Sequence, residues 1–238
     1  MSEHQAFRRS GAAQSGVQFD QGLRRHMLRV YNYMASGVLL TGIVALLVAS
    51  TPALYQPIFG TPLKWVVMLA PLAFVFFFTF RIESMSAATA QAMFWVFSCL
   101  MGLSLASVFL VFTGTSIAQT FFIAAALFLT MSLWGYTTGR DLSKAGSFLM
   151  MGLIGVVIAS VVNLFLGSTI LQLAVSIIGV LVFTGLTAWD TQNIKAQYAE
   201  HHGHEANSKL AVSGALSLYL NFVNIFQLLL TFTGQREE

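Results

Sequence analysis

The stretch Thr169–Trp189, TILQLAVSIIGVLVFTGLTAW, is an uncharged apolar run that ends directly at Asp190. About twenty such residues in a helix are long enough to cross the hydrocarbon core of a bilayer. An ionisable group where such a run meets its polar flank is either an ordinary interfacial residue or part of an ion or proton path. Which of these two interpretations applies to Asp190 depends on the residues that the rest of the chain places beside it.

The composition of the whole chain is that of a polytopic membrane protein. Hydrophobic residues make up 56% of the 238 residues and charged residues only 9%, and the mean hydropathy is +0.74. Soluble domains contain about 25% charged residues, which makes a soluble domain a poor explanation. The pI near 9.2 does not indicate nucleic-acid binding, because the net charge is only +3. We therefore expect the chain to lie in a lipid bilayer.

Seven apolar segments predict seven transmembrane helices. The predicted spans are residues 28–50, 64–81, 86–112, 116–136, 145–166, 169–192 and 213–233. They form a single all-α domain over residues 28–233, preceded by a polar tail of residues 1–27 and followed by a short tail of residues 234–238. Residues 1–18 are polar and expected to be mobile. The apolar stripe that begins at Phe19 favours a short interfacial helix or a helical extension of the first span, and both alternatives stay open.

The distribution of Lys and Arg predicts the orientation. With a cytoplasmic N-terminus, the inside segments carry ten basic residues and the outside segments only Lys64 and Arg236. The ten are Arg8, Arg9, Arg24, Arg25, Arg29, Arg81, Arg140, Lys144, Lys195 and Lys209. Such a bias is typical of the cytoplasmic side of a membrane protein. Seven spans then leave the C-terminus outside, unless the last segment is a re-entrant hairpin.

Small residues at four-residue spacing predict close helix packing. They are Ser98, Gly102 and Ala106 in the third span and Gly155 and Ala159 in the fifth. Small side chains let helices approach closely where no hydrophobic drive brings them together. This pattern indicates packing, not activity.

The last span is unusually polar for its length, with Tyr219, Asn221, Asn224 and Gln227. The three amides lie three residues apart and share one helix face. In hydrocarbon they must face protein or water, so they either form interhelical hydrogen bonds or line a path. The stripe predicts that the seventh helix is central, surrounded by the other six.

Arg81 is the candidate partner of Asp190. Arg81 ends the second span and Asp190 the sixth, and the charge distribution puts both ends on the inside. A charge-assisted contact between them is geometrically allowed. The alternative is that both side chains reach separately into the headgroup region.

The sequence does not indicate an enzyme or a cofactor. It contains no nucleotide-binding loop, zinc-protease signature or nucleophile elbow. The histidines lie in the leader or in the loop with His201, His202 and His204, so no zinc ligand set is expected in the membrane. We interpret that loop as solvated rather than as a specific metal site.

Five passages resemble the Bax inhibitor-1 (transmembrane Bax inhibitor motif) family, in its bacterial branch. They are VYNYM (30–34), FRIESMS (80–86), GYTTGRDLS (135–143), GLTAWDTQ (185–192) and LYLNFVNIF (218–226). They occur in the same order as in the family and cover nearly the whole chain. The resemblance implies a seven-helix fold with the last helix at the centre.

The resemblance also implies a pH-sensitive calcium leak, in which acids on the sixth and seventh helices share protons and engage an arginine on the second. The first acid falls on Asp190 and the arginine on Arg81. The second acid falls on Asn221, which departs from the family's usual aspartate. An amide does not titrate, and it can donate a hydrogen bond that favours charged Asp190. We therefore expect a pH gate that is weakened or moved to lower pH.

Two functional hypotheses follow. In the first, the protein is a passive calcium leak channel of the inner (plasma) membrane, modulated by pH. Asp190 binds the ion weakly or gates it, Arg81 latches Asp190, and Asn221 and Asn224 line the path. In the second, it is a non-conducting membrane protein that interacts with a membrane-bound quality-control protease or modulates stress responses, and the N-terminal tail is the segment offered to that partner.

Overall fold

The computed structural model describes the backbone of residues 3–199 and 203–236, and side chains from Gln21 onward within these ranges. The helices are α1 (Glu3–Ser50), α2 (Pro52–Phe59), α3 (Leu63–Arg81), α4 (Ala87–Val111), α5 (Gly114–Thr137), α6 (Ser143–Leu166), α7 (Thr169–Gln197) and α8 (Gly203–Thr233). A short 3₁₀ turn, η1 (Ile82–Ser84), follows α3. In the described part of the chain, seven helices are long and apolar enough to cross a membrane. The predicted all-α, seven-span fold is confirmed.

Local sequence signals set the limits of several helices. Ser86, Thr113 and Ser168 are N-cap residues whose hydroxyl oxygens accept hydrogen bonds from the backbone N–H three residues on. These bonds satisfy donors that the first turn of a helix leaves without an intrahelical partner. Gly167 ends α6 with φ +60°, a left-handed conformation that glycine adopts without steric cost.

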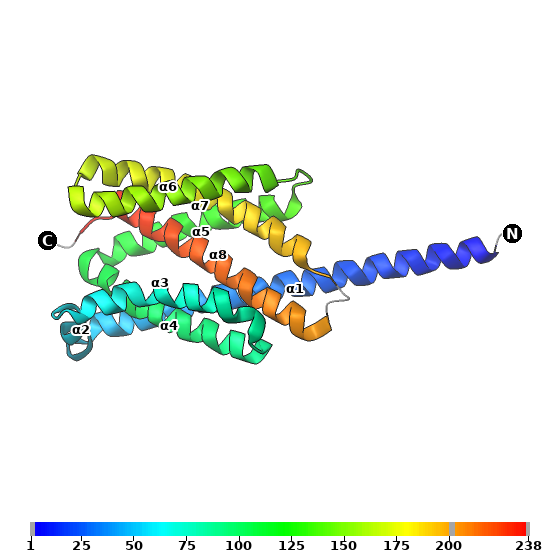
Figure 1. Ribbon diagram of the computed structural model, residues 1–238, viewed down its shortest axis with the longest axis horizontal. Coiled ribbons are helices and arrows are strands. Elements are labelled where there is room, and N and C mark those ends of the chain that lie inside the picture. Colours follow the sequence, from blue (N-terminus) through cyan, green and yellow to red (C-terminus); the bar gives the residue numbers. More distant parts are fainter. Residues whose placement is uncertain (1–2, 200–202, 237–238) are drawn as a thin grey trace.

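The helices run along the bundle between its two ends (Figure 1), and these ends differ in composition. At one end, which we call the basic end, Arg29 Nη1 donates to Ser208 Oγ at 3.0 Å and Lys209 Nζ donates to the carbonyl of Glu83 at 3.1 Å. At the opposite end, the backbone N–H of Thr113 donates to the carbonyl of Gln235 at 3.0 Å. The continuous helix α8 joins the two ends. At 31 residues it is about 46 Å long, so the last segment spans the bundle and is not re-entrant.

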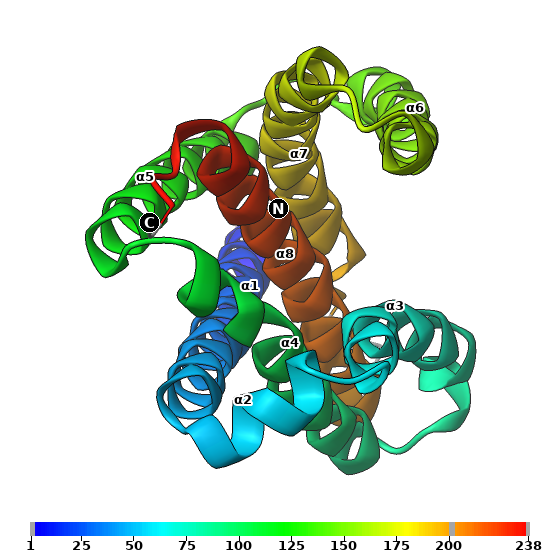
Figure 2. The same cartoon turned by 90° about the vertical axis from the view of Figure 1, so that its left-hand side faces the viewer.

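Helix α8 has the largest buried share of the seven candidate spans. It packs against α1, α4, α5 and α7, whereas α3 packs mainly on α4 and α6 mainly on α7 (Figure 2). The prediction that the last helix is surrounded by all six others is therefore not confirmed. α3 and α6 lie further out, and this arrangement creates the site described below.

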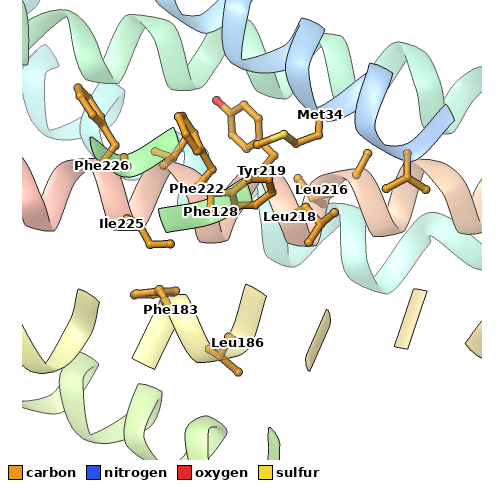
Figure 3. Packing of buried hydrophobic residues seen from close by; sticks show 14 of the residues in the cluster. Met34, Phe128, Phe183, Leu186, Leu216, Leu218, Tyr219, Phe222, Ile225 and Phe226 are labelled. Atoms are coloured by element: carbon orange, nitrogen blue, oxygen red, sulfur yellow. The ribbon is translucent and has the colours of Figure 1, made fainter. Parts of the chain in front are cut away.

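The core is built on α8 (Figure 3). Tyr219, Leu218 and Ile225 of this helix are fully buried. The Tyr219 ring packs edge-on against Phe94 and Phe97 of α4, and its hydroxyl lies 2.6 Å from Thr41 Oγ1 of α1. Aromatic packing and a satisfied hydroxyl together fix α8 against α1 and α4.

Candidate functional site

A cavity of about 590 Å³ opens between α3 and α6, with α7 and α8 as its floor. Its walls are apolar and include Met68, Leu72, Val75, Met150, Leu153 and Val157. Its polar lining comes from Asp190 on α7, from Ser104 on α4, and from Ser217, Asn221, Asn224 and Gln227 on α8. The cavity exists because α3 and α6 pack on α4 and α7 and leave this face of α8 uncovered.

Asp190 and Asn221 meet at the floor of this cavity. The Asn221 Nδ2 atom donates a hydrogen bond of 2.7 Å to Asp190 Oδ2. Asn221 is buried, with 5% of its surface exposed, and Asp190 is partly buried. An amide donating to a carboxylate forms a charge-assisted hydrogen bond that fixes the carboxylate's orientation.

Asp190 lies deeper in the bundle than the sequence indicated. The prediction ended the span at residue 192, but α7 continues to Gln197. Asp190 is thus two helical turns, or about 10 Å, from the end of α7. The amide oxygen of Gln192 accepts from the backbone N–H of Leu142 and its Nε2 donates to the carbonyl of Arg140, so the last turns of α7 are tied to the α5–α6 loop.

Two further α8 amides line the cavity beyond Asn221. Asn224 Nδ2 donates to the carbonyl of Leu220 at 2.8 Å, within its own helix, and Gln227 lies one turn further along. The predicted amide stripe therefore faces the cavity and not only neighbouring helices. Only Asn221 uses its amide to bridge to Asp190 in the described part of the chain.

Arg81 is not brought to Asp190. It is the last residue of α3, it is exposed, and its carbonyl accepts a hydrogen bond from Ser84 Oγ at 2.8 Å. Within the described residues no hydrogen bond or ion pair joins Arg81 to Asp190; the side-chain partner of Asp190 is Asn221. The expected latch is therefore not formed in this conformation.

Apolar side chains of α7 and α8 pack together on the basic-end side of Asp190. Ile194, one turn beyond Asp190 on α7, is buried together with Ala211 and Ala215 of α8. Gly214 faces Ile194 so closely that a Cβ atom added to it would lie 2.9 Å from Ile194 Cγ1. The glycine thus permits tight contact between α7 and α8.

The sequence interpretation missed a second polar group next to the site. The hydroxyls of Tyr31 and Ser132 lie 2.7 Å apart, and 2.9 Å separates Ser132 Oγ from Thr191 Oγ1. This chain links α1, α5 and α7 directly behind Asp190. Single Ser and Thr residues are common in membrane helices, where they bond to their own backbone, so their spacing gave no signal.

The site offers few ligands for a cation. Among the described residues, Asp190 is the only carboxylate that lines the cavity, beside serine and amide side chains. The side chains described from Gln21 onward include no group of three or more His, Cys, Asp or Glu residues that could hold a metal ion. His201 and His202 of the histidine-rich loop lie outside the described residues. Calcium prefers six to eight oxygen ligands, so binding at Asp190 would be weak.

Comparison with known proteins gives a consistent family assignment. Residues 23–238 match the family model described as "Inhibitor of apoptosis-promoting Bax1". An uncharacterized protein of Rickettsia prowazekii is 49% identical over 220 residues, covering 92% of this chain and 93% of its own. A protein of Caulobacter vibrioides is 44% identical over 95% of both chains. The inner membrane protein YbhL of Escherichia coli is 43% identical over 92% of this chain and 95% of its own.

Proposed function

The chain belongs to the Bax inhibitor-1 family, and on that premise we propose that it is a passive, pH-modulated calcium (cation) leak channel without enzymatic activity. The observation that carries the proposal is the Asp190 carboxylate at the floor of the cavity, held by Asn221. Ionisable groups within membrane spans are costly and mark ion or proton pathways. The Escherichia coli relative is named an inner membrane protein, and this supports an inner-membrane location for the present chain.

The polar lining suggests the course of the path. From Asp190, the amides of Asn221, Asn224 and Gln227 continue along α8 toward the end of the bundle opposite the basic end. The basic end faces the cytoplasm in this proposal, because Lys and Arg are concentrated on that side of membrane proteins. A cation would then reach Asp190 from the outer side.

The packing on the other side of Asp190 supports a closed conformation. Buried Ile194 packs tightly against Gly214 on the basic-end side of Asp190. Conduction would need α7 and α8 to separate there. Protonation of Asp190 would remove the charge that attracts the cation, so flux would fall as the pH is lowered.

The small ligand set suits a leak better than a storage site. One carboxylate with neighbouring amides binds calcium weakly. A conducting site must attract an ion and also release it. Arg81 forms no hydrogen bond or ion pair with Asp190 among the described residues. The proposed closed state therefore depends on Asp190, Asn221 and Ile194.

Flux measurements in liposomes test the proposal. The purified protein is reconstituted with an enclosed calcium dye, and Asp190→Asn is compared with Asp141→Asn, which makes the same change in an exposed loop. We expect calcium entry above that of empty liposomes, its loss in Asp190→Asn and its retention in Asp141→Asn. Equal flux for both variants, or no flux above empty liposomes, would contradict the proposal.

A second candidate is a membrane interaction protein without conduction. The N-terminal part of α1 projects well beyond the bundle (Figure 1), and the predicted partner is a membrane-bound quality-control protease. Crosslinking in cells with the full chain and with a variant lacking residues 1–18 tests this candidate. Recovery of a protease by the full chain alone supports it, whereas equal or no recovery contradicts it.

A further inference from the structure

A second, polar pocket lies at the basic end of the bundle, away from Asp190. It has a volume of about 240 Å³ and lies between α1, the residue after α7 and the start of α8. Its lining includes Arg25, His26, Arg29, Tyr198, His204 and Asn207. Among the residues that the structure describes, none that lines the pocket is acidic and two, Arg25 and Arg29, carry a positive charge.

Two buried polar atoms in this pocket lack a partner in the described part of the chain. They are Nε2 of His26 and Oδ1 of Asn207. His26 is buried, with 5% of its surface exposed, and its ring lies 5.2 Å from that of Tyr198. Buried polar side-chain atoms nearly always have a hydrogen-bond partner. An oxygen of a bound ligand would supply a partner for His26 Nε2, whereas Asn207 Oδ1 is an acceptor and needs a donor such as a water molecule.

The charges in the pocket favour an anion. Arg29 uses one N–H to donate to Ser208 Oγ, and Arg25 Nε donates to the carbonyl of Gln21 at 3.4 Å. Each guanidinium has five N–H donors, and within the described part of the chain each is seen to use one of them. The N-terminus of α8 at Gly203 also borders the pocket, and helix N-termini favour negative charge.

We infer that this pocket binds an oxyanion of the phosphate class, supplied by free phosphate or by the headgroup of an anionic phospholipid. The guanidinium groups of Arg25 and Arg29 would hold the anion's oxygens, and His26 Nε2 would bond it from the buried side. The volume is below the range of pockets for drug-sized ligands, which fits a small ion or a headgroup. The bound anion would join α1 to α8 at the membrane surface.

The test uses the full chain in nanodiscs of phosphatidylcholine, with and without phosphatidylglycerol. Binding of inorganic phosphate is followed by ³¹P line broadening, and retained phosphatidylglycerol by native mass spectrometry. Arg25→Gln is compared with Arg24→Gln. Arg24 is the neighbouring, equally exposed arginine, but it lines the separate groove between α1 and α5. Thermal unfolding establishes that both variants are folded, and His204→Gln gives a second, independent change in the pocket.

We expect Arg25→Gln to weaken binding about tenfold or more, since hydrogen bonds to charged groups are strong, and Arg24→Gln to leave it nearly unchanged. Phosphate binding in pure phosphatidylcholine identifies free phosphate as a ligand, and selective retention of phosphatidylglycerol identifies the headgroup. His204→Gln should weaken the same signal. Absence of both signals, or equal losses in Arg24→Gln and Arg25→Gln, would overturn the inference.

Discussion

Asn221 of α8 donates a hydrogen bond of 2.7 Å to the carboxylate of Asp190 on α7. The resemblance to the family implies an acid at the position of Asn221, where this chain has an amide. The described contact between the two helices therefore contains one titratable group, Asp190. This difference makes pH dependence the property that tests the site most directly.

Replacing Asn221 by Asp is expected to strengthen the pH dependence of calcium flux. Two adjacent carboxylates share a proton, and they titrate as a pair rather than as single groups. Protonation of the pair removes charge that attracts the cation, so flux should fall several-fold as pH is lowered in a liposome assay. Asn224→Asp is the control, because Asn224 lines the same cavity but bonds to Leu220. An equal response of both variants would show that the Asp190 contact is not the cause.

Truncating Ile194 to Ala is expected to raise calcium flux several-fold. Ile194 is 5% exposed and packs against Gly214, and in the proposed closed state this contact blocks the path between the cavity and the basic end. Removal of a buried side chain leaves a void that the surroundings fill only partly. Ile178→Ala is the matched control, since Ile178 lies on the same helix and is 53% exposed. If Ile194→Ala conducts no faster than Ile178→Ala, the closure lies elsewhere.

Asp141 is expected to make no contribution to the pH dependence of flux between about pH 5 and pH 8. Its Oδ1 accepts from the backbone N–H of Ser143 at 2.9 Å, and hydrogen bonds from Ser143 lower the pKa of Asp141. A carboxyl group with a lowered folded-state pKa stabilises the fold above its unfolded pKa of about 3.9. That contribution is lost only as pH falls through the folded-state pKa.

Asp141 therefore stays charged throughout this range. Asp141→Asn should leave the shape of the flux–pH curve unchanged, as measured by parallel titrations of both proteins. A curve displaced by the substitution would assign part of the pH response to the α5–α6 loop.

The helices could be predicted from hydropathy because each apolar segment is long. The predicted span 64–81 corresponds to α3 (Leu63–Arg81), and the span 169–192 to α7 (Thr169–Gln197). Hydropathy indicates depth in lipid rather than helix length. It therefore missed the short α2 (Pro52–Phe59) and the polar first turns of α8. The predicted segment before the first span is helical and continuous with it, because α1 runs unbroken from Glu3 to Ser50.

The site could be predicted only in part. The period of an α-helix put Asn221 and Asn224 on one face, and both line the cavity with Asp190. The predicted contact with Arg81 depended on both residues lying at the same end of the bundle. The order of the helices shows at which end of the bundle each residue lies, but not how deep Asp190 lies or which helix packs beside it. Asp190 lies two turns inside α7, and α3, which carries Arg81, packs on α4. Helix packing is set by side-chain fit, which spacing alone does not show.

Replacing Gly135 by Ala is expected to destabilise the bundle strongly. An added Cβ would overlap the carbonyl of Ala188 and lie 2.7 Å from Ala188 Cα. Backbone atoms cannot rotate away, so α5 and α7 must separate beside Asp190. Overpacking of this kind costs about 1–3 kcal/mol or more in the free energy of unfolding. Thermal unfolding in detergent measures the change.

Gly155→Ala is the matched control for Gly135→Ala. The sequence predicted close packing at Gly155, but an added Cβ there meets no described atom within 4 Å. Alanine loses less conformational entropy than glycine when it folds into a helix. This variant should therefore be as stable as the original protein, or more stable by about 0.5–1 kcal/mol. If the two variants unfold at the same temperature, close contact between α5 and α7 is not what holds Asp190 in place.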